Sequence, residues 1–343
     1  MIDKLLRKRL DHLQFSEQPC LLLMGQVPVG YGAQISGRLL GLKLALALDR
    51  KAVFPSASDW PYVQTVVPPF SWNGDLRTIQ KAPLIDVSGL DGRSMVRFDY
   101  LAVDQQLRSR GTDVQEWIDR LLAARLDLTR DDLQKFDGWL LSWLQFLPEL
   151  ESRLRLDMER LGVSKGILGV HIRRGDKKVE TPYVSPERIN TAISRIYSKW
   201  KFSGVFVASD CPDAPSFLKL PAGVSILFDE QEMRYNNANH RMLSANPTMS
   251  SQETYVAFKN MRLLGECGGV VGQQNAHFAT LAASYIFNRD SRSERLTLID
   301  PNCLPKLVLI KQRLKWGLRS LVKSAVPRSL LARVDHFIHK RSG

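Results

Sequence analysis

Short apolar runs alternate along this chain with segments in which apolar residues recur at helical spacing. Residues 19–25 read as one continuous apolar run, which is typical of a parallel strand buried on both faces. A loop with two glycines follows, residues 34–48 show helical spacing, and residues 52–54 predict the next strand. This strand–loop–helix–strand unit favours a parallel α/β fold.

The same rhythm returns after a helical stretch at residues 113–160, in which Thr129 is expected to cap one helix. Further strands are predicted at residues 84–87, 167–172, 205–208, 224–228 and 269–272, and further helices from Ser185 and over 253–265 and 276–285. At this length the chain fits two domains of roughly 150 residues each. We therefore expect an α/β fold of two Rossmann-like domains facing a central cleft, divided as 1–162 and 163–300, with a tail at 301–343.

Composition narrows the class of protein. With 44% apolar and 24% charged residues the chain resembles soluble globular proteins. No apolar run reaches the ~18–20 residues that span a bilayer, and the charged N-terminus lacks the apolar stretch of a signal peptide, so we expect a cytoplasmic protein. Four cysteines lie without paired or metal-type spacing, so neither a disulfide framework nor a structural metal is expected.

Polar residues gather where three predicted strands end. They are His171, Arg173, Arg174, Asp176 and Lys177 after the first of these strands, Asp210 after the second, and the run from Gly272 to Asn275 after the third. In open parallel sheets, ligands bind beyond the carboxyl ends of the strands. An arginine fork can hold a diphosphate with two parallel hydrogen bonds and can stabilise the negative charge on a leaving phosphate without a metal ion. The pattern therefore predicts a sugar-nucleotide-dependent transferase.

Simpler interpretations of the same residues stay open. Arg173 and Arg174 can be a solvated pair at a strand end, or can form a salt bridge with Asp176. Glycine-rich turns such as Gly30-Tyr31-Gly32 often serve tight packing alone. No Ser–His–Asp or zinc arrangement can be assembled from the sequence.

Four segments resemble the superfamily of α1,2-, α1,6- and protein O-fucosyltransferases, and most closely the α1,6 enzymes, including the rhizobial enzymes that modify Nod factors. The segments are residues 30–34, 171–177, 205–210 and 264–283. The resemblance implies a GT-B-like enzyme that uses GDP-fucose as donor, inverts the sugar centre, and needs neither a metal ion nor another cofactor. Its partners would be the nucleotide-sugar donor and a glycan acceptor, with no nucleic acid.

The resemblance also implies roles for individual residues. Arg173 and Arg174 match the arginines that hold the donor diphosphate, and His171 matches the histidine near the guanine ribose. Asp176 and Lys177 occupy positions that support the loop and the catalytic network. The other donor-binding residues that it implies are Gly30, Tyr31, Gly32, Asp210, Asn260, Asn275 and Ala276.

Glu180 lies close to the position at which the α1,6 enzymes carry the carboxylate proposed as general base. Such a base takes the proton of the acceptor hydroxyl as its oxygen attacks the anomeric carbon. The simpler alternative is a solvated Glu180 that merely precedes a helix.

The chain departs from the family pattern at three places. It reads Asp210-Cys211-Pro212 where the α1,6 enzymes read Asp-Asp-Pro, and Gln274-Asn275-Ala276 where they are serine-rich. Asn260 replaces the aspartate that reads the guanine base. A carboxylate accepts two hydrogen bonds from guanine, whereas an amide offers one acceptor and one donor group.

The net charge of +13 is concentrated at the C-terminal end. Residues 311–343 hold nine lysines and arginines against one acid, Asp335. Apolar and basic residues alternate over 314–323, as in a basic amphipathic helix that lies on an anionic membrane. We expect the tail to bring the protein to the inner face of the membrane; a helix packed on the protein body with its charges solvated is the alternative.

Two other functions remain as alternatives. Asn260 and the altered third segment would also suit an enzyme of the same architecture that uses a different nucleotide sugar. The basic tail would also suit a non-catalytic protein that binds membrane or nucleic acid.

Overall fold

A computed structural model of the chain describes residues 2–18, 20–25, 30–54, 65–66, 81–87, 92–174, 182–234 and 245–302. The chain divides into two compact units, Met1–Ile299 and Asp300–Gly343. The basic tail belongs to the second unit, and all of it beyond Asn302 lies outside the described residues. Every described helix and strand belongs to the first unit.

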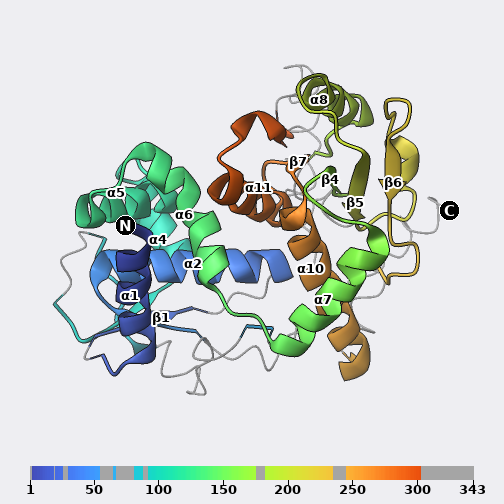
Figure 1. The fold of residues 1–343 in the computed structure, drawn as a ribbon. Coiled ribbons are helices and arrows are strands. Elements are labelled where there is room, and N and C mark those ends of the chain that lie inside the picture. Colours follow the sequence, from blue (N-terminus) through green and yellow to red (C-terminus); the bar gives the residue numbers. More distant parts are fainter. Residues whose placement is uncertain are drawn as a thin grey trace, which may run out of the picture. The chain divides into compact units, whose positions relative to one another are not determined.

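The first sheet has three parallel strands in the order β2-β1-β3. Figure 1 labels its central strand, β1, below helix α2. They are β1 Leu21–Met24, β2 Lys51–Val53 and β3 Met95–Phe98. Helix α2, Tyr31–Leu48, connects β1 to β2. Helix α1, Ile2–Phe15, precedes the sheet and buries Leu6, Leu10 and Leu13, whose spacing of four and three places them on one helix face.

Four helices lie along the chain between β3 and the second sheet. They are α4 Tyr100–Arg108, α5 Val114–Leu126, α6 Arg130–Trp143 and α7 Pro148–Leu161. Thr129 and Asp132 form a capping box at the start of α6, which confirms the predicted cap. Pro148 is the first residue of α7, and Gly162, with a φ of 70°, ends it in the left-handed conformation.

The second sheet has five parallel strands in the order β6-β5-β4-β7-β8. Its strands are β4 Ile167–Ile172, β5 Gly204–Ser209, β6 Ser225–Leu227, β7 Gly269–Gln273 and β8 Leu296–Ile299. Numbered from β4, this is the order 3-2-1-4-5 of a Rossmann fold. Its helices are α8 Pro186–Lys199, α10 Pro247–Glu266 and α11 His277–Asp290, with short 3-10 turns at Ala214–Phe217 and Ser293–Arg295.

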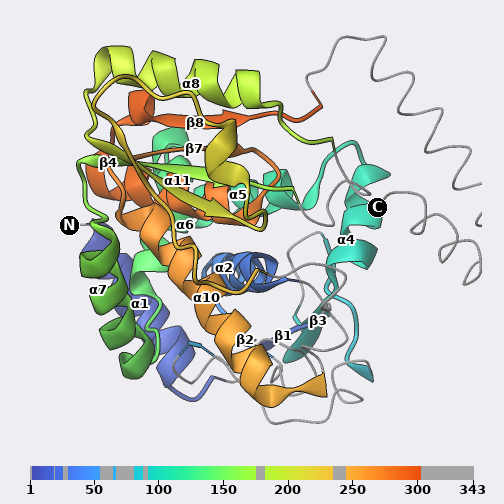
Figure 2. The same ribbon diagram turned by 90° about the vertical axis from the view of Figure 1, so that its right-hand side faces the viewer.

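Helices cover both faces of this sheet, with α8 on one face and α10 and α11 on the other (Figure 2). Successive side chains of β4 therefore enter different layers, because strand residues point to opposite faces in turn. Leu168 and Val170 belong to the apolar cluster that contains the buried face of α8. Gly169 lies against α10, since a Cβ added to it would be 3.1 Å from Leu264. His171 faces the same way as Gly169.

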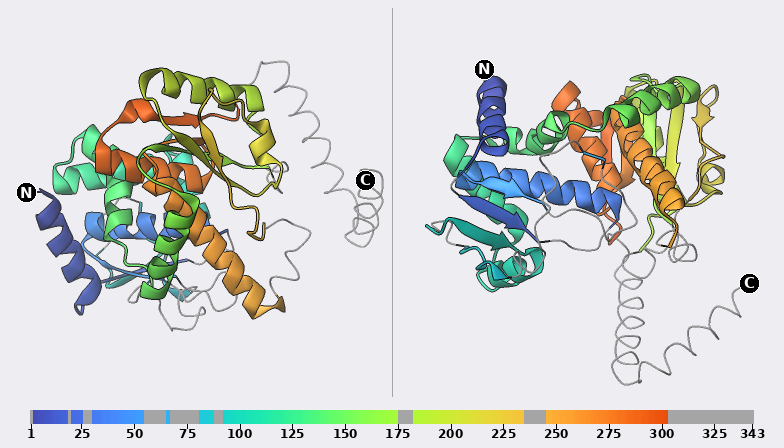
Figure 3. Two further views of the ribbon diagram at one scale, coloured as in Figure 1. Left: turned by 45° about the vertical axis from the view of Figure 1, so that its right-hand side comes forward. Right: turned by 90° about the horizontal axis from the view of Figure 1, so that it is seen from below.

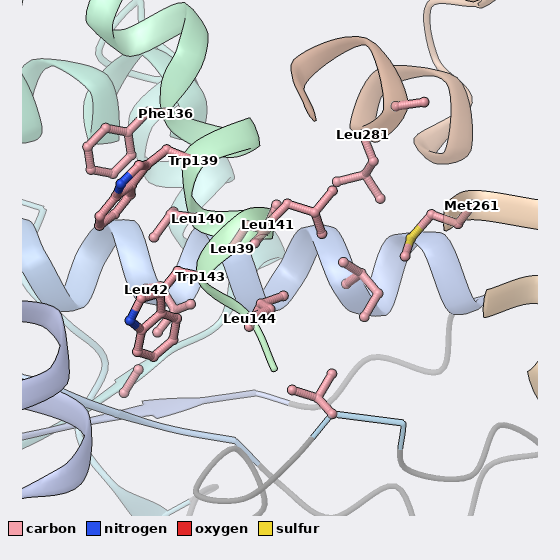
Figure 4. Packing of buried hydrophobic residues seen from close by; sticks show 14 of the residues in the cluster. Leu39, Leu42, Phe136, Trp139, Leu140, Leu141, Trp143, Leu144, Met261 and Leu281 are labelled. Atoms are coloured by element: carbon pink, nitrogen blue, oxygen red, sulfur yellow. The ribbon is translucent and has the colours of Figure 1, made fainter. Parts of the chain in front are cut away.

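One apolar cluster joins the two halves of the first unit. Helix α2 runs from the first sheet toward α10 and α11 (Figure 3). Figure 4 shows Leu39 of α2, Leu140 of α6, Met261 of α10 and Leu281 of α11 within this cluster. Helix α6 packs so closely on α11 that a Cβ added to Gly138 would lie 2.0 Å from the carbonyl oxygen of Ser284.

The α/β class and the two parallel sheets are confirmed. The predicted strand at 84–87 is wrong, because its described contact is a single bridge between Leu84 and Arg97 of β3. The predicted division at residue 162 falls within the first compact unit and stays a prediction. Among the described helices, none is both long enough and apolar enough to cross a membrane.

Candidate active site

The carboxyl ends of β5, β4 and β7 meet at one edge of the second sheet. Ile172 at the end of β4 pairs with Ser209 at the end of β5. The chain therefore leaves three neighbouring strands at Arg173, Asp210 and Gln274. The strand order reverses at β4, and ligands of open parallel sheets bind at such a reversal.

Asp210 holds the start of the loop that follows β4. Its Oδ2 lies 3.1 Å from Nη1 of Arg173, and its Oδ1 accepts a hydrogen bond of 2.7 Å from the backbone N–H of Arg174. The neighbouring Ser209 donates to the carbonyl of Ile172 at 2.7 Å and accepts from the backbone N–H of Cys211 at 3.0 Å. The first two residues of the basic loop are thus fixed against the end of the next strand.

The two arginines occupy different environments. The guanidinium of Arg174 lies over the rings of Tyr183 and Phe217, 5.0 and 5.3 Å from their centroids, and burial lowers its pKa. Phe217 packs on the apolar cluster of the α8 face. Arg173 is one residue earlier and pairs with Asp210 instead. The two guanidinium groups therefore have different neighbours: a carboxylate for Arg173 and two aromatic rings for Arg174.

His171 is a buried, neutral imidazole beside Arg173. The residue is 8% exposed, and its Nδ1 has no hydrogen-bond partner among the described residues. Burial, and then the positive charge of Arg173, lower its pKa to about 3. Its ring lies 5.7 Å from that of Phe278 in the first turn of α11. Such a nitrogen can take part in a hydrogen bond with a ligand without carrying charge.

The N-terminus of α11 closes the other side of the edge. Gly272 of β7 lies close to the first turn of α11. A Cβ added to it would lie 2.5 Å from Cβ of Ala279 and 3.3 Å from Cβ of His171, so α11 can pack this closely on β7 only because residue 272 is glycine. Gln273 Nε2 donates to Asn275 Oδ1 at 2.7 Å, and Ala276 precedes the first helical residue. Helix N-termini present backbone N–H groups that bind anions.

The N-terminal glycine segment reaches this edge through packing. Gly30 precedes α2, and Tyr31 is buried with its hydroxyl in a 2.9 Å hydrogen bond with Thr65. A Cβ added to Gly32 would lie 2.6 Å from the ring of Phe278. The structure thus shows a packing role for Tyr31 and Gly32, and their contact with a donor stays a prediction.

Asn260 lies in a buried polar cluster on α10. Its amide nitrogen donates to both carboxylate oxygens of Glu232 at 3.1 Å. Lys259 pairs with the same carboxylate at 3.0 Å and with Asp229 at 2.6 Å. Burial alone would raise the pKa of Asp229, but hydrogen bonds from Arg160 and Lys259 outweigh it and lower that pKa to about 2. The described partners of Asn260 are therefore internal, and a guanine contact stays a prediction.

Glu253 is a candidate residue that the sequence analysis did not single out. It is 5% exposed on α10, and its Oε2 has no hydrogen-bond partner among the described residues. Burial, reinforced by the charge of Glu232 and opposed by Arg173, raises its pKa to about 8. The sequence holds one indication of this placement: Glu253 lies seven residues before Asn260, which puts the two side chains on the same face of α10. At neutral pH it is a neutral acid within electrostatic reach of Arg173.

Three predicted residues lie outside the described residues. They are Asp176, Lys177 and Glu180, in the segment 175–181. Elsewhere in the part of the chain that is described, no three His, Cys, Asp or Glu side chains gather in a way that could hold a metal ion.

Comparison with known proteins finds similarity of structure alone. No family model and no curated protein matches the chain. NodZ α1,6-fucosyltransferase soaked with GDP-fucose is 14% identical, with a TM-score of 0.43 over 76% of this chain and 91% of that one. A mutant of Arabidopsis thaliana FUT1 in complex with GDP is 12% identical, with a TM-score of 0.47 over 83% and 73%. POFUT1 in complex with GDP-fucose is 10% identical, with a TM-score of 0.42 over 83% and 99%.

The geometry of the strand edge suits a phosphate-bearing ligand. It combines a fixed cation, Arg173, with the N-terminus of α11 and a neutral imidazole. The cation and the helix terminus both favour negative charge, and a preorganised site does not have to reorient when that charge develops.

Proposed function

We propose that this chain is an inverting, metal-independent glycosyltransferase that transfers fucose from GDP-fucose to a hydroxyl of a glycan. The observation that carries the proposal is the Arg173–Asp210 pair, 3.1 Å apart, where the strand order of a Rossmann-type sheet reverses. The choice of fucose and guanine comes from the four segments that resemble fucosyltransferases.

Arg173 and the N-terminus of α11 would bind the donor diphosphate from two sides. A guanidinium offers five N–H donors, so Arg173 can bind phosphate oxygens while Asp210 orients it. Each charge-assisted hydrogen bond of this kind contributes about 1.5–3 kcal/mol. Loss of Arg173 should therefore weaken donor binding by about tenfold or more.

The same cation would assist the chemical step. The acceptor oxygen attacks the anomeric carbon, the bond from that carbon to the diphosphate oxygen breaks, and GDP leaves with the electron pair. Arg173 stabilises the charge that grows on the leaving phosphate, which is the task of a metal ion in other transferases. In the family pattern the hydroxyl proton goes to a carboxylate, and Glu180 is the residue that we assign to this role.

A second donor class is favoured by one observation. Asn260 donates to Glu232 instead of presenting a carboxylate, so the expected acceptor pair for guanine is absent at this position. Thermal-shift measurements with GDP-, UDP- and ADP-sugars would separate the two cases. A ligand at 100 times its Kd stabilises a protein by about 2.7 kcal/mol.

Replacing Arg173 tests the proposal directly. In R173A the affinity for GDP-fucose measured by isothermal titration should fall by about tenfold or more, and release of GDP in the presence of a glycan mixture should be lost. Arg155, which is exposed on α7 and bonds only Ser152 among the described residues, supplies the matched control R155A. Equal activity of R173A and R155A would refute the phosphate role. Absence of binding to any nucleotide sugar would instead favour a non-catalytic basic protein.

We further propose that the enzyme is cytoplasmic and that its basic tail brings it to the inner face of the membrane. The support is the charge of residues 311–343 and their alternation of basic and apolar positions. A tail packed on the protein body remains the alternative, and the two differ in binding to anionic vesicles.

A further inference from the structure

A cavity of about 630 Å³ is lined by α2, α11 and the carboxyl ends of β1 and β3. Its volume is within the range of about 300–1,000 Å³ that is typical of small-molecule sites. Leu39 of α2 and Leu281 of α11 belong to its lining and are visible in Figure 4. Met24 and Phe98 contribute from the ends of the two strands.

The cavity borders the proposed donor site through the first turn of α11. The hydroxyl of Ser36 and Nδ1 of His277, both in the lining, share a hydrogen bond of 2.8 Å that joins α2 to α11. The next residue, Phe278, packs against the ring of His171. A molecule in the cavity would therefore lie within one helix turn of the residues that we assign to the donor.

Arg38 is a buried cation in this lining. The residue is 9% exposed, and no described residue forms a hydrogen bond or an ion pair with its guanidinium. Burial lowers its pKa, which reflects the cost of a charge without a partner in the interior. Such a side chain is stable when a ligand brings a matching group.

The remaining charges of the lining balance each other. Nζ of Lys43 lies 2.7 Å from Asp137, and both residues line the cavity. Asp119, outside the lining, is a further 3.8 Å partner of Lys43. Arg38 is therefore the cation of this lining that the described carboxylates leave uncompensated.

The other walls are largely apolar and aromatic. Phe54 and Phe98 are buried in the lining, and Tyr100 and Leu101 are exposed at its rim. Aromatic walls with a few placed polar groups are typical of ligand sites, and aromatic faces suit the C–H faces of sugar rings. The combination points to a saccharide that carries an anionic group.

We infer that this cavity binds the acceptor, and that the acceptor is an acidic saccharide whose carboxylate or phosphate pairs with Arg38. An arginine binds either group through two parallel hydrogen bonds. That the bound saccharide is the acceptor rests on the proposed transferase function. The binding of an acidic saccharide can be measured without any reaction.

Three probes that differ at one carbon test the anionic preference. They are p-nitrophenyl β-glucoside, its C6 carboxylate (the glucuronide) and its 6-phosphate. Titrated calorimetrically against the full chain, at least one anionic probe should bind about tenfold or more tighter than the neutral one. The better of the two identifies the preferred anion. Equal binding of all three probes would overturn the inference.

Variants assign the preference to the cavity. R38M should remove it, and R130M, at an exposed arginine in the first turn of α6, should keep it. Gly37 lines the cavity, and a Cβ added to it would meet nothing within 4 Å, so G37L fills space without backbone strain and should weaken all three probes. An anionic preference that survives in R38M would overturn the assignment to Arg38.

Donor binding keeps the two hypotheses separable. R38M should bind GDP-fucose like the parent chain, and R173A should retain the anionic preference. If the parent chain does not bind GDP-fucose but prefers the anionic probes, only the proposed function is refuted. Normal GDP-fucose binding without an anionic preference would refute only the acceptor inference.

Discussion

The carboxylate of Asp210 holds Arg173 through Nη1 at 3.1 Å and, at the same time, holds the backbone of the following residue. Asp210 is a positioning residue in this arrangement, because its carboxylate contacts Arg173 and the backbone of Arg174, and a carboxylate would repel an anionic donor. Its removal should loosen the loop and weaken GDP-fucose binding by about 10–100-fold, the equivalent of one charge-assisted hydrogen bond.

Titration calorimetry of D210A with GDP-fucose measures this effect. Asp213, exposed three residues later, makes no side-chain cap bond to the turn that follows it, so D213A is a suitable control. An affinity of D210A equal to that of D213A would contradict the positioning role.

Arg173 and Arg174 should respond differently to substitution. R173A should lose transfer while keeping the fold, because the side chain of Arg173 is partly exposed and Asp210 keeps its hydrogen bond from the backbone of Arg174. R174A removes a guanidinium stacked on two aromatic rings and should lower stability by about 0.5–1 kcal/mol per ring contact. Its effect on turnover should be smaller. Denaturation and GDP release measured on both variants give the comparison; identical profiles would contradict the separation.

Gly272 should tolerate no side chain. In G272A the new methyl group would meet Ala279 and His171, and overpacking of this kind costs about 1–3 kcal/mol. Gly37, a helical glycine with open space around it, is the matched control, and G37A should raise stability by about 0.5–1 kcal/mol. Urea denaturation of both variants tests the contrast, and a neutral G272A would show that α11 can shift away from β7.

Glu253 should make stability depend on pH. Its pKa rises from an ordinary 4.5 to about 8 in the folded protein. Below about pH 4.5 the acid is protonated in both states and its contribution is complete. As the pH rises toward 8 the unfolded chain ionises first, so the folded state loses stability.

The variant E253Q lacks this titration. Between pH 4.5 and 8 the stability of E253Q should rise relative to that of the parent by a few kcal/mol, because each unit by which folding raises the pKa of Glu253 is equivalent to about 1.4 kcal/mol. Melting curves at pH 4.5, 6 and 8 measure the gain, with E230Q at an exposed glutamate as control. Parallel curves for E253Q and the parent would show that Glu253 ionises normally.

The basic tail should bind anionic vesicles. Vesicles with phosphatidylserine should carry the full chain to the top of a flotation gradient and leave a chain ending at residue 310 at the bottom. Each basic residue near the surface contributes about 1 kcal/mol, so raised salt should release the full chain. Equal flotation of both chains would favour a tail packed on the body.

Buried strands and helix starts could be predicted from the sequence because their signals are local. The run at Ile167–Ile172 is apolar at nearly every position, as expected for a strand covered on both faces. Ser185 and Pro186 together predict the start of the helix that the structure places at Pro186. Strands β3 and β8 were not predicted because a polar residue interrupts each apolar run, Arg97 in β3 and Thr297 in β8.

The candidate site divides in the same way. The gathering of His171, Arg173 and Asp210 followed from strand ends. The different partners of Arg173 and Arg174 could not be predicted, because both residues lie in the loop beyond the end of β4. The burial of Glu253 and the isolation of Arg38 could not be predicted, because both depend on which helices pack together. Helix α1 was missed although its leucines recur at helical spacing.

The close approach of Gly138 to Ser284 has a consequence for turnover. The apolar cluster that joins the two halves of the first unit includes residues of α6 and α11 on both sides of this contact. Closely packed interiors resist gradual deformation. A hinge motion that separated the two sheets would break the packing of this cluster. Exchange of the nucleotide by such a motion would therefore have a high free-energy barrier. Release of the spent nucleotide should therefore depend on small local motions at the strand edge, and added viscogen should slow turnover little.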